Sequence, residues 1–507
     1  MRTRQALKNM AASLLLQVVL AVSGIIVPRF FTVLYGSSVN GLVSSISQFI
    51  TYMGLVEAGI GAAGTVALYG PIARKQTDEI NGIVSAARVF YQRSGLIFVA
   101  LVALLVLLYP FAVRNEIQDV SFIRMMILVL SVNGIVDYFF LGKYRVLLQA
   151  DQRSYIVSLI QIAGTVVMTV VSLCLIELKM SALLVKGVTA VVYLLRSVVV
   201  AVYVKQHYPH VSFREKPRME AFDQRWAALL HQIVGMIVNN ASVVLLTLCV
   251  KTNALVEVSV YSVYNLVGYS LSSLMTAISN GLGSGFGQVI SQKEDRVLRR
   301  SYSSYEFLFF LVIFIAYTCM AVLLYPFVGL YSMDFSDARL YIRWELVVLF
   351  TAAGLLQCIR LPGLTMICAA GHYKQTRAAA ILEAVVNLVV SLALIRPLGI
   401  TGTMFGVCVS YLYRTTDIIL YNARHFVRGS LKTTLKRLTC NAALMAVLVF
   451  LGIRMIPQQA DSWYAWFVYA ICFGISACII FTSVNLAIDP REGKSLLSRA
   501  KELLKRN

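Results

Sequence analysis

VVSLCLI occupies residues 170–176, and VVSLALI, which differs from it at one position, occupies residues 389–395. Other pairs of similar stretches recur along the chain in the same order and at nearly the same separation. Together they indicate that a unit of roughly 218 residues is duplicated, and such a repeat has to be settled before the fold is assigned. The other pairs are LLYPF at 107–111 and 323–327, YLLRS at 193–197 with YLYRT at 411–415, and Tyr203 and His207 with Tyr421 and His425.

The composition is that of a membrane protein. Hydrophobic residues make up 59% of the 507 residues and charged residues only 14%, whereas soluble proteins have about 25% charged residues. Apolar runs long enough to cross a hydrocarbon core of about 30 Å recur along the chain, and their backbone has to be helical because the alternation typical of barrel strands is missing. The fourteen runs are 11–35, 40–69, 95–113, 120–142, 155–177, 181–204, 227–250, 257–288, 303–330, 340–360, 377–396, 400–422, 438–455 and 463–487.

We therefore predict an all-α integral membrane protein with about 14 transmembrane helices, in two pseudo-symmetric six-helix lobes followed by two C-terminal helices. Six is an even number, so both copies of the repeat enter the membrane in the same orientation, as in transporters whose two halves rock around a midplane site. The predicted domains are an N-lobe at 1–215, a C-lobe at 216–430, and a last part at 431–507 with helices thirteen and fourteen and a basic amphipathic tail.

The basic residues predict which way the chain faces. Most of the 45 Lys and Arg residues fall in the two termini and in alternate loops. The positive-inside rule then places both termini in the cytoplasm, and the net charge of +21 reflects topology rather than nucleic-acid binding. The loops on the opposite side carry Arg114, Lys179, Lys251, Arg339, Arg396 and Arg454.

Sequence motifs give no indication of an enzyme. HExxH, GxSxG and Walker patterns are missing, the outward loops are short, and the five His and nine Cys residues are scattered without a CxxC pair. We expect no catalytic residue, no metal and no cofactor.

Ionisable residues inside the apolar runs are the candidate functional residues, because each costs about 2.5 to 3.5 kcal/mol at a helix centre. Arg196 and Arg414 occupy equivalent positions of the two repeats, where they can face one anion from both lobes. The alternative is that each base pairs with a nearby acid, as Arg414 and Asp417 can at i, i+3 spacing. The bases are Arg29, Lys186, Arg196, Arg360 and Arg414, and the acids are Glu57, Asp137, Glu345, Glu383 and Asp417.

Three asparagines add to these candidates. Asn239, Asn240 and Asn265 either line a cleft or hydrogen bond between helices. The basic excess in the membrane favours an anionic substrate, since Arg binds phosphate through two parallel hydrogen bonds.

Two stretches resemble a known family. EAGIGAAGTVALYGPIARKQTDEINGIVSAARVFYQR (57–93) is similar to the second and third helices of polysaccharide flippases, the Wzx-like branch of the multidrug/oligosaccharidyl-lipid/polysaccharide (MOP) superfamily. AAGHYKQTRAAAILEAVVNLVVSLALIRPLGITGTMFGVCVSYLYR (369–414) is similar to their helices eleven and twelve. The resemblance implies a MATE/MOP-like fold and the flipping of a polyprenyl-pyrophosphate-linked oligosaccharide from the cytoplasmic to the outer leaflet of a bacterial plasma membrane.

The resemblance also implies a cationic cavity lined by Arg29, Arg196, Arg360 and Arg414. Glu57 and the three asparagines are further cavity candidates, because they are polar residues within the apolar runs. Asp137, Glu345, Glu383 and Asp417 are then candidates for ion coupling or internal pairs, and transport can be coupled to the membrane potential, H⁺ or Na⁺. One departure matters: many relatives read Asn-Thr-Asp in helix seven, whereas this chain reads Asn240, Ala241, Ser242, which leaves ion coupling open.

Other functions remain open. A multidrug antiporter of the same superfamily would export organic cations and should favour buried acids without an excess of arginine. A membrane glycan polymerase or transferase should carry catalytic residues on a long outer loop. The implied partners are the lipid-linked glycan, the bilayer and other polysaccharide-assembly proteins, and the glycan can belong to capsule, O-antigen, teichoic acid or exopolysaccharide.

Overall fold

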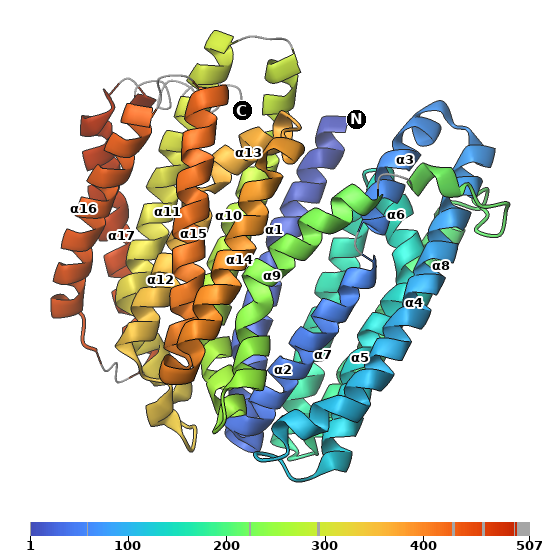
Figure 1. Ribbon diagram of the computed structural model, residues 1–507, viewed down its shortest axis with the longest axis horizontal. Coiled ribbons are helices and arrows are strands. Elements are labelled where there is room, and N and C mark those ends of the chain that lie inside the picture. The colour runs from blue at the N-terminus through green and yellow to red at the C-terminus, as the bar shows by residue number, and fades with distance from the viewer. Residues whose placement is uncertain are drawn as a thin grey trace. The chain divides into compact units, whose positions relative to one another are not determined.

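A computed structural model describes residues 2–57, 59–222, 225–291, 295–427, 431–458, 462–490 and 492–493 (Figure 1). The regular elements in these residues are all helices. Contacts divide the chain into two compact units, Met1–Ser262 and Val263–Asn507, called unit 1 and unit 2 below. This division follows packing, so the domain boundaries expected from the repeat, after residues 215 and 430, stay predictions. The predicted amphipathic tail beyond residue 493 lies outside the described residues.

Unit 1 is built from long helices, two of which are interrupted by irregular turns. A 3₁₀ turn, η1 (Gly54–Glu57), and Gly59 in a left-handed conformation (φ 87°) separate α2 from α3. The predicted run at 40–69 is therefore two helices, because glycine tolerates a backbone conformation that a hydropathy profile does not detect. A π-helical turn, η2 (Asp137–Leu141), joins α5 to α6. The α-helices are α1 (Arg2–Tyr35), α2 (Ser37–Met53), α3 (Ile60–Arg74), α4 (Thr77–Val113), α5 (Val120–Val136), α6 (Gly142–Ala150), α7 (Ser154–Glu177), α8 (Ala182–His207), α9 (Arg225–Cys249) and the start of α10 (Ala254–Ser291).

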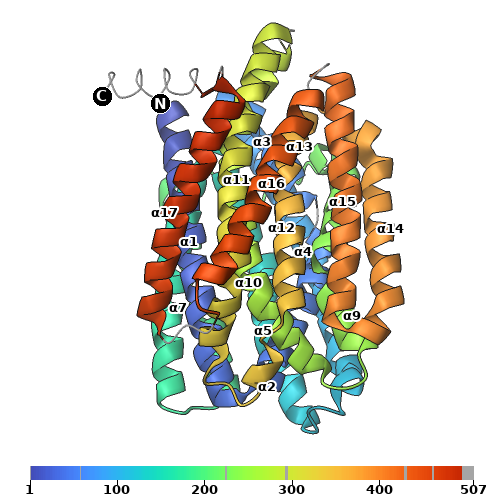
Figure 2. The same ribbon diagram turned by 90° about the vertical axis from the view of Figure 1, so that its left-hand side faces the viewer.

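Unit 2 holds the rest of α10 and seven further α-helices among its described residues. Helices α16 and α17 pack beside α11, as Figure 2 shows. Two buried amides, Asn441 on α16 and Asn485 on α17, donate to each other's side-chain oxygens at 3.1 and 2.8 Å, which fixes this pair of helices. The seven are α11 (Asp295–Ser332), α12 (Trp344–Ile359), α13 (Leu361–Ala369), α14 (Tyr373–Leu398), α15 (Ile400–His425), α16 (Leu431–Met455) and α17 (Trp463–Ile488).

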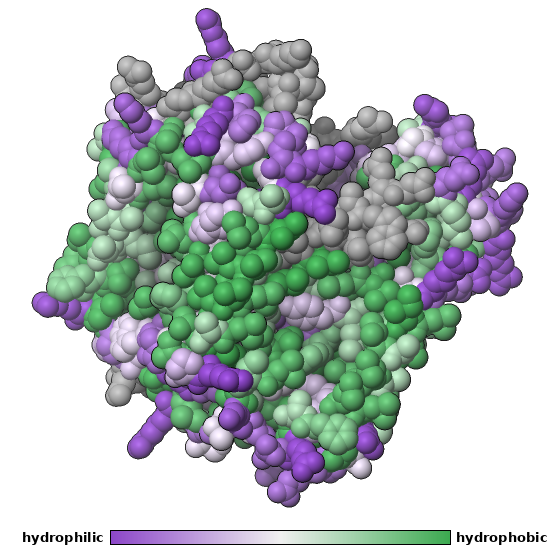
Figure 3. All heavy atoms as spheres, viewed as in Figure 1, coloured by the Kyte–Doolittle hydropathy of each residue, from purple (hydrophilic) through white to green (hydrophobic). Residues whose placement is uncertain are grey.

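The apolar runs predicted from the sequence are helices. By length and composition, 11 helical segments of the described residues can cross a membrane, and each coincides with a predicted run. The other three runs, 227–250, 257–288 and 400–422, correspond to α9, α10 and α15. Many large apolar side chains are exposed, and hydrophobic residues cover much of the surface in Figure 3. Such a surface is stable in lipid and unfavourable in water, as expected for a multi-pass membrane protein.

The duplication is present in the structure. Helix α8 (182–207) is as long as α15 (400–425), and their first and last residues are separated by the same number of positions. The same is true of α6 (142–150) and α13 (361–369). Tyr203 and His207 at the end of α8 stack with ring centroids 4.0 Å apart. Tyr421 and His425 at the end of α15 stack at 4.1 Å. The repeat noted in the sequence is therefore a repeat of helices and of side-chain contacts.

The repeated seven-residue stretch lies where helices approach closely. Its shared serine is buried in both copies, as Ser172 on α7 and Ser391 on α14. A Cβ atom added to Gly406 of α15 would overlap the hydroxyl oxygen of Ser391, and one added to Gly402 would overlap the carbonyl oxygen of Leu394. Small residues thus let α14 and α15 pack backbone against backbone, as is common between membrane helices.

Candidate functional site

Unit 2 contains a network of four charged side chains, two of which are buried. Arg360, between α12 and α13, donates to the Glu383 carboxylate on α14. The same carboxylate lies 3.6 Å from the Arg414 guanidinium on α15, and Arg414 donates to Asp417 at 2.6 Å. Arg414 and Glu383 are each 5% exposed. Two bases and two acids cancel, so the network carries no net formal charge.

The network identifies the partners of two candidate bases. The pair between Arg414 and Asp417, expected as one alternative from their i, i+3 spacing, is present. The guanidinium of Arg360 also lies over the Tyr411 ring, 4.6 Å from its centroid. Buried charges left without a partner are costly, and these contacts account for how four ionisable groups are tolerated between apolar helices.

The equivalent arginine of unit 1 has different surroundings. Arg196 is half-buried on α8, and its guanidinium lies 4.1 Å from the centroid of the Tyr193 ring. Gly164 of α7 stands where a Cβ atom would touch the arginine stem at 3.4 Å. Among the residues that the structure describes, Arg196 forms no ion pair, so the two arginines at corresponding positions of the repeat are not electrically equivalent.

Polar side chains in unit 1 meet where the two irregular turns face each other. Arg145 of α6 donates to Asp137 at the start of η2 at 2.7 Å. Tyr91 of α4 donates to the Glu57 carboxylate in η1 at 3.2 Å. Tyr138 of η2 donates to the Gly54 carbonyl at 3.1 Å, which ties one turn to the other. π-helical turns often occur at functional sites.

Arg145 and Tyr91 were not among the candidates from the sequence. Arg145 follows the predicted run at 120–142, whereas the helical segment continues from Val120 to Ala150. The signal that could have found it is the nearby acid earlier in the same segment, Asp137, which needs a base inside the membrane. No sequence pattern could have identified Tyr91, because a tyrosine in an apolar helix is common.

Two further bases lie on α1 and α8. The Lys186 ammonium is 4.4 Å from the centroid of the Phe31 ring, a cation–π contact with α1. Arg29, on the same helix as Phe31, is half-buried and lies 5.9 Å from the Phe30 ring centroid. Away from the ends of its spans, unit 1 thus has the bases Arg29, Arg145, Lys186 and Arg196 and the acids Glu57 and Asp137, whereas the network in unit 2 has two of each.

The remaining candidates lie apart from these clusters. Asn239 is exposed on α9 and donates to the carbonyl of Gly235 one turn earlier at 2.6 Å. Asn240 on α9 and Asn265 on α10 are half-buried, and Glu345 is exposed in the first turn of α12. In the described part of the chain, no three His, Cys, Asp or Glu side chains gather closely enough to hold a metal ion.

Comparison with known proteins gives structural matches only. No protein-family model matches the chain, and no curated protein matches it by sequence. The fold is similar to that of the lipid II flippase MurJ in an inward closed conformation, with a TM-score of 0.68 and 14% identity over 94% of this chain and 100% of that one.

Multidrug transporters share the fold as well. An inward-facing multidrug resistance MATE family transporter of the MOP superfamily matches with a TM-score of 0.59 and 14% identity, over 85% of this chain and 96% of that one. A eukaryotic MATE transporter matches with a TM-score of 0.55 and 13% identity, over 86% and 98%. The expected MATE/MOP-like fold is thereby confirmed, and these neighbours are transporters and flippases rather than enzymes.

Proposed function

We propose that this chain is a flippase that moves a polyprenyl-pyrophosphate-linked oligosaccharide from the cytoplasmic to the outer leaflet of a bacterial plasma membrane. The observation that carries the proposal is the excess of basic side chains within the spans of unit 1, in a fold that matches a lipid II flippase over that flippase's whole length. Such bases suit a diphosphate headgroup, because guanidinium and phosphate match in charge and in hydrogen-bond geometry.

Arg29 and Arg196 are the residues we expect to bind the diphosphate. Arg196 has a stacking partner and no ion pair among the described residues, so its donors can turn toward a ligand without breaking a salt bridge. Arg360 forms an ion pair with Glu383, and Arg414 forms one with Asp417. We assign these two to holding α12 to α15 in register rather than to the headgroup.

Alternating access is the mechanism we propose. The headgroup would cross through a hydrated path while the polyprenyl tail remains in lipid. A headgroup with about −2 charges that moves outward across an inside-negative membrane gains about 4.6 kcal/mol per 100 mV, since one charge contributes about 2.3. The membrane potential alone can therefore drive transport, with H⁺ or Na⁺ as additional coupling ions.

A second candidate is an antiporter for organic cations, in keeping with the MATE neighbours. One observation favours it: the Glu57 carboxylate accepts a hydrogen bond from Tyr91 rather than from an arginine. A carboxylate bound to a neutral group can exchange a proton for a cation. The surplus of bases in the same unit opposes cation binding, and for that reason we rank this function second.

Depletion of the protein in its host separates the two functions. Polyprenyl-linked glycans would be extracted after depletion and assigned to a leaflet with a membrane-impermeant glycan-modifying enzyme. A flippase predicts that complete lipid-linked oligosaccharide accumulates on the cytoplasmic side. Unchanged glycan pools together with new sensitivity to cationic drugs would reject the flippase and support the antiporter.

Substitutions test the assigned residues in the same host. Arg29→Ala and Arg196→Ala should each reduce glycan export at least tenfold, while the protein inserts at normal levels. Arg124→Ala is the matched control, because Arg124 is an exposed base of the same unit on α5 and should leave export unchanged. Normal export by both well-expressed variants would contradict the assignment of these two arginines.

A further inference from the structure

The segment after α8 is held against the first half of α4. The backbone N–H of Arg218 donates to the Gly82 carbonyl at 3.0 Å, and the backbone N–H of Ser212 donates to the Asn81 side chain at 2.9 Å. The Arg88 guanidinium donates to the carbonyl of Phe213 at 3.3 Å. Residues 208–218 therefore have a defined position on this end of unit 1.

This arrangement brings basic side chains from four segments together. Lys143 of α6 lies 5.0 Å from the centroid of the Tyr144 ring and 6.0 Å from that of Phe213, and the two rings meet edge to face at 5.1 Å. Further bases lie close to this ammonium: Arg88 on α4 donates to the Phe213 carbonyl, Arg214 directly follows Phe213, and Lys205 is in the last turn of α8.

All four charges have the same sign, and we call them the basic cluster (Arg88, Lys143, Lys205 and Arg214). No carboxylate of the described residues forms an ion pair with any of them. Like charges gathered on a partly desolvated surface repel each other, so the folded state gains if an anion from outside the chain binds among them. Hydrophilic side chains gather at this end of unit 1 in Figure 3, where Figure 1 places α3, α6 and the segment after α8.

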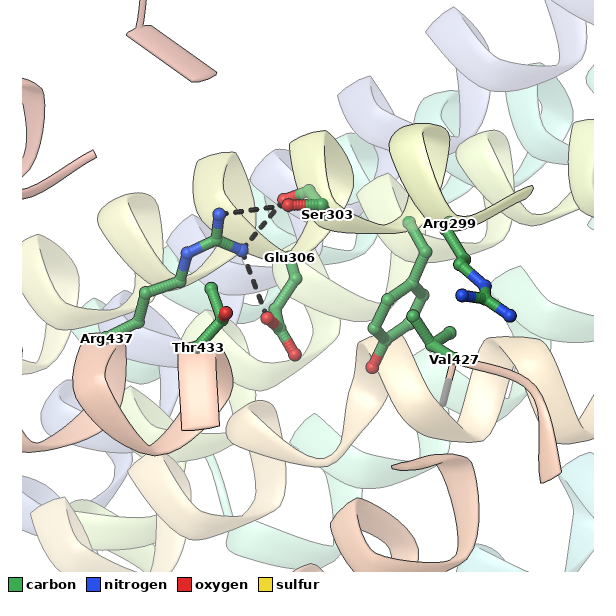
Figure 4. Close-up of a pocket in the computed structure, with 7 residues that line it drawn as sticks. Arg299, Ser303, Glu306, Val427, Thr433 and Arg437 are labelled. Atoms are coloured by element: carbon green, nitrogen blue, oxygen red, sulfur yellow. Dashed lines mark hydrogen bonds and ion pairs between the residues drawn. The ribbon is translucent and has the colours of Figure 1, made fainter. Parts of the chain in front are cut away.

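In unit 2, the base near the start of the helix equivalent to α4 is neutralised. Helix α11 carries the second LLYPF copy and is thus the counterpart of α4. There Arg437 of α16 is 2% exposed and binds both Glu306 of α11, at 3.1 Å, and Asp489, at 2.5 Å. Figure 4 shows Arg437 directed at Ser303 and Glu306. These residues line a cavity of about 200 Å³. The base is neutralised within unit 2 by groups of its own, and the basic cluster of unit 1 is not.

We propose that the basic cluster binds the phosphate of an anionic phospholipid in the leaflet next to this end of unit 1. Lys205 lies in the last turn of one segment that can cross a membrane, Ala182–His207, and Lys143 lies about two turns before the end of another, Val120–Ala150. Lipid phosphodiesters are the abundant anions at that depth, and basic pockets at helix ends bind such headgroups. The Tyr144 and Phe213 rings pack beside the Lys143 ammonium and fix its position. The site is separate from Arg29 and Arg196, so it goes beyond the proposed transport function.

The test is a binding titration of the purified full-length protein in neutral detergent. Dioleoylphosphatidylglycerol and, as the neutral reference, dioleoylphosphatidylcholine would be added stepwise, with bound lipid counted by native mass spectrometry. Wild-type protein should hold one phosphatidylglycerol in clear preference to phosphatidylcholine. The variant Lys205→Gln with Arg214→Gln should bind phosphatidylglycerol about thirtyfold more weakly, because two bases near an anionic headgroup are lost.

The substituted residues and those of the control variant are exposed, so all variants should fold as the wild type does. Lys205 and Arg214 are exposed, and their substitution leaves the hydrogen bonds of Arg88 and Arg218 in place. Lys374→Gln with Arg424→Gln removes two exposed bases from unit 2 and should bind lipid as the wild type does. Equal binding by wild type and the Lys205/Arg214 variant would overturn the proposal, as would equal losses in both double variants.

A third titration identifies the source of the phosphate. Polyprenyl diphosphate presents the same chemistry as the lipid headgroup. If it displaces phosphatidylglycerol from the wild type at a concentration at least tenfold lower, the basic cluster is a loading site for cargo and the phospholipid assignment is wrong. If phosphatidylglycerol binds at least as tightly, the assignment stands. Neither result depends on whether the chain transports a glycan.

Discussion

Glu383 is the residue on which the charge balance of unit 2 depends. Its two carboxylate oxygens lie against different arginines, one on Arg360 and the other 3.6 Å from Arg414. The side chains of Arg360 and Arg414 are only 11% and 6% exposed, so water is a poor replacement for this carboxylate. A single acid thereby keeps two buried bases compatible with the membrane.

Neutralising that acid should destabilise the protein. Glu383→Gln removes one negative charge and leaves Arg360 without a carboxylate, which costs about 3 to 5 kcal/mol for a buried pair that loses one partner. The apparent melting temperature in detergent should fall by many degrees. Adding Arg360→Gln to Glu383→Gln restores the balance and should recover part of the loss. If the double variant is as unstable as the sum of the single variants, the network does not act as a charge-balanced unit.

Local spacing predicts some of these contacts and not others. The pair of Arg414 with Asp417 could be predicted because both lie on one helix face, at i, i+3 spacing. The contact between Arg414 and Glu383 joins two different helices and depends on how α14 packs against α15, which single-chain patterns do not determine. Arg145 was missed for a related reason, since polar residues end an apolar run in a hydropathy window even where the helix continues.

At the scale of helices, irregular ends and turns are held by distant side chains. Helix α10 begins at Ala254, and the backbone N–H of Leu255 donates to the Glu116 carboxylate at 3.0 Å. This acid sits in the connection between α4 and α5 and caps a helix that begins far along the chain. The apolar runs themselves were predicted from composition, but such a cap between distant segments was not.

The Glu116 cap should respond to pH. Burial raises the pKa of the Glu116 carboxyl above its usual value of 4.5, although the backbone N–H groups of Leu255 and Ala254 act in the opposite direction. Because the pKa in the folded state is the higher one, the contribution of Glu116 is greatest below the unfolded pKa and is lost as pH rises through the folded value.

The melting temperatures of the wild type and of two Glu116 variants test this pH dependence. Glu116→Gln keeps an acceptor without a charge, so it should melt slightly above wild type at pH 7 and equal to it near pH 4. Glu116→Ala loses the acceptor as well and should cost about 1 kcal/mol, as lost helix caps do. A wild-type protein that gains stability relative to Glu116→Gln as pH rises would refute this sign.

At the scale of the whole molecule, hydropathy and the repeat were sufficient to predict the fold class. Fourteen apolar runs, the first twelve of which form two similar sets of six, predict a helical membrane protein with a duplicated unit, and both features are found. What could not be predicted is which of these charges pair: Arg360 and Arg414 share Glu383, whereas Arg196 forms no ion pair among the described residues. Such pairing depends on contacts between helices distant in sequence.

Orientation is a prediction at this scale. If the basic loops face the cytoplasm, alkaline phosphatase fused after residue 117, 180 or 252 should be active, and fusions at either terminus should be inactive. A green fluorescent protein fused to the C-terminus should fluoresce, which provides the complementary readout. Active phosphatase at a terminus would reverse the orientation and with it the proposed direction of transport.

The ion pair between Arg437 and Glu306 makes α11 depend on α16. Glu306 lies within α11 and is 3% exposed, and the base that neutralises it comes from α16. A shortened chain that ends before α16 would leave this carboxylate without the Arg437 base, which favours its protonation or the unfolding of α11. Helices α16 and α17 are therefore not a removable module, and a minimal version of this protein would need a change at position 306 along with the deletion.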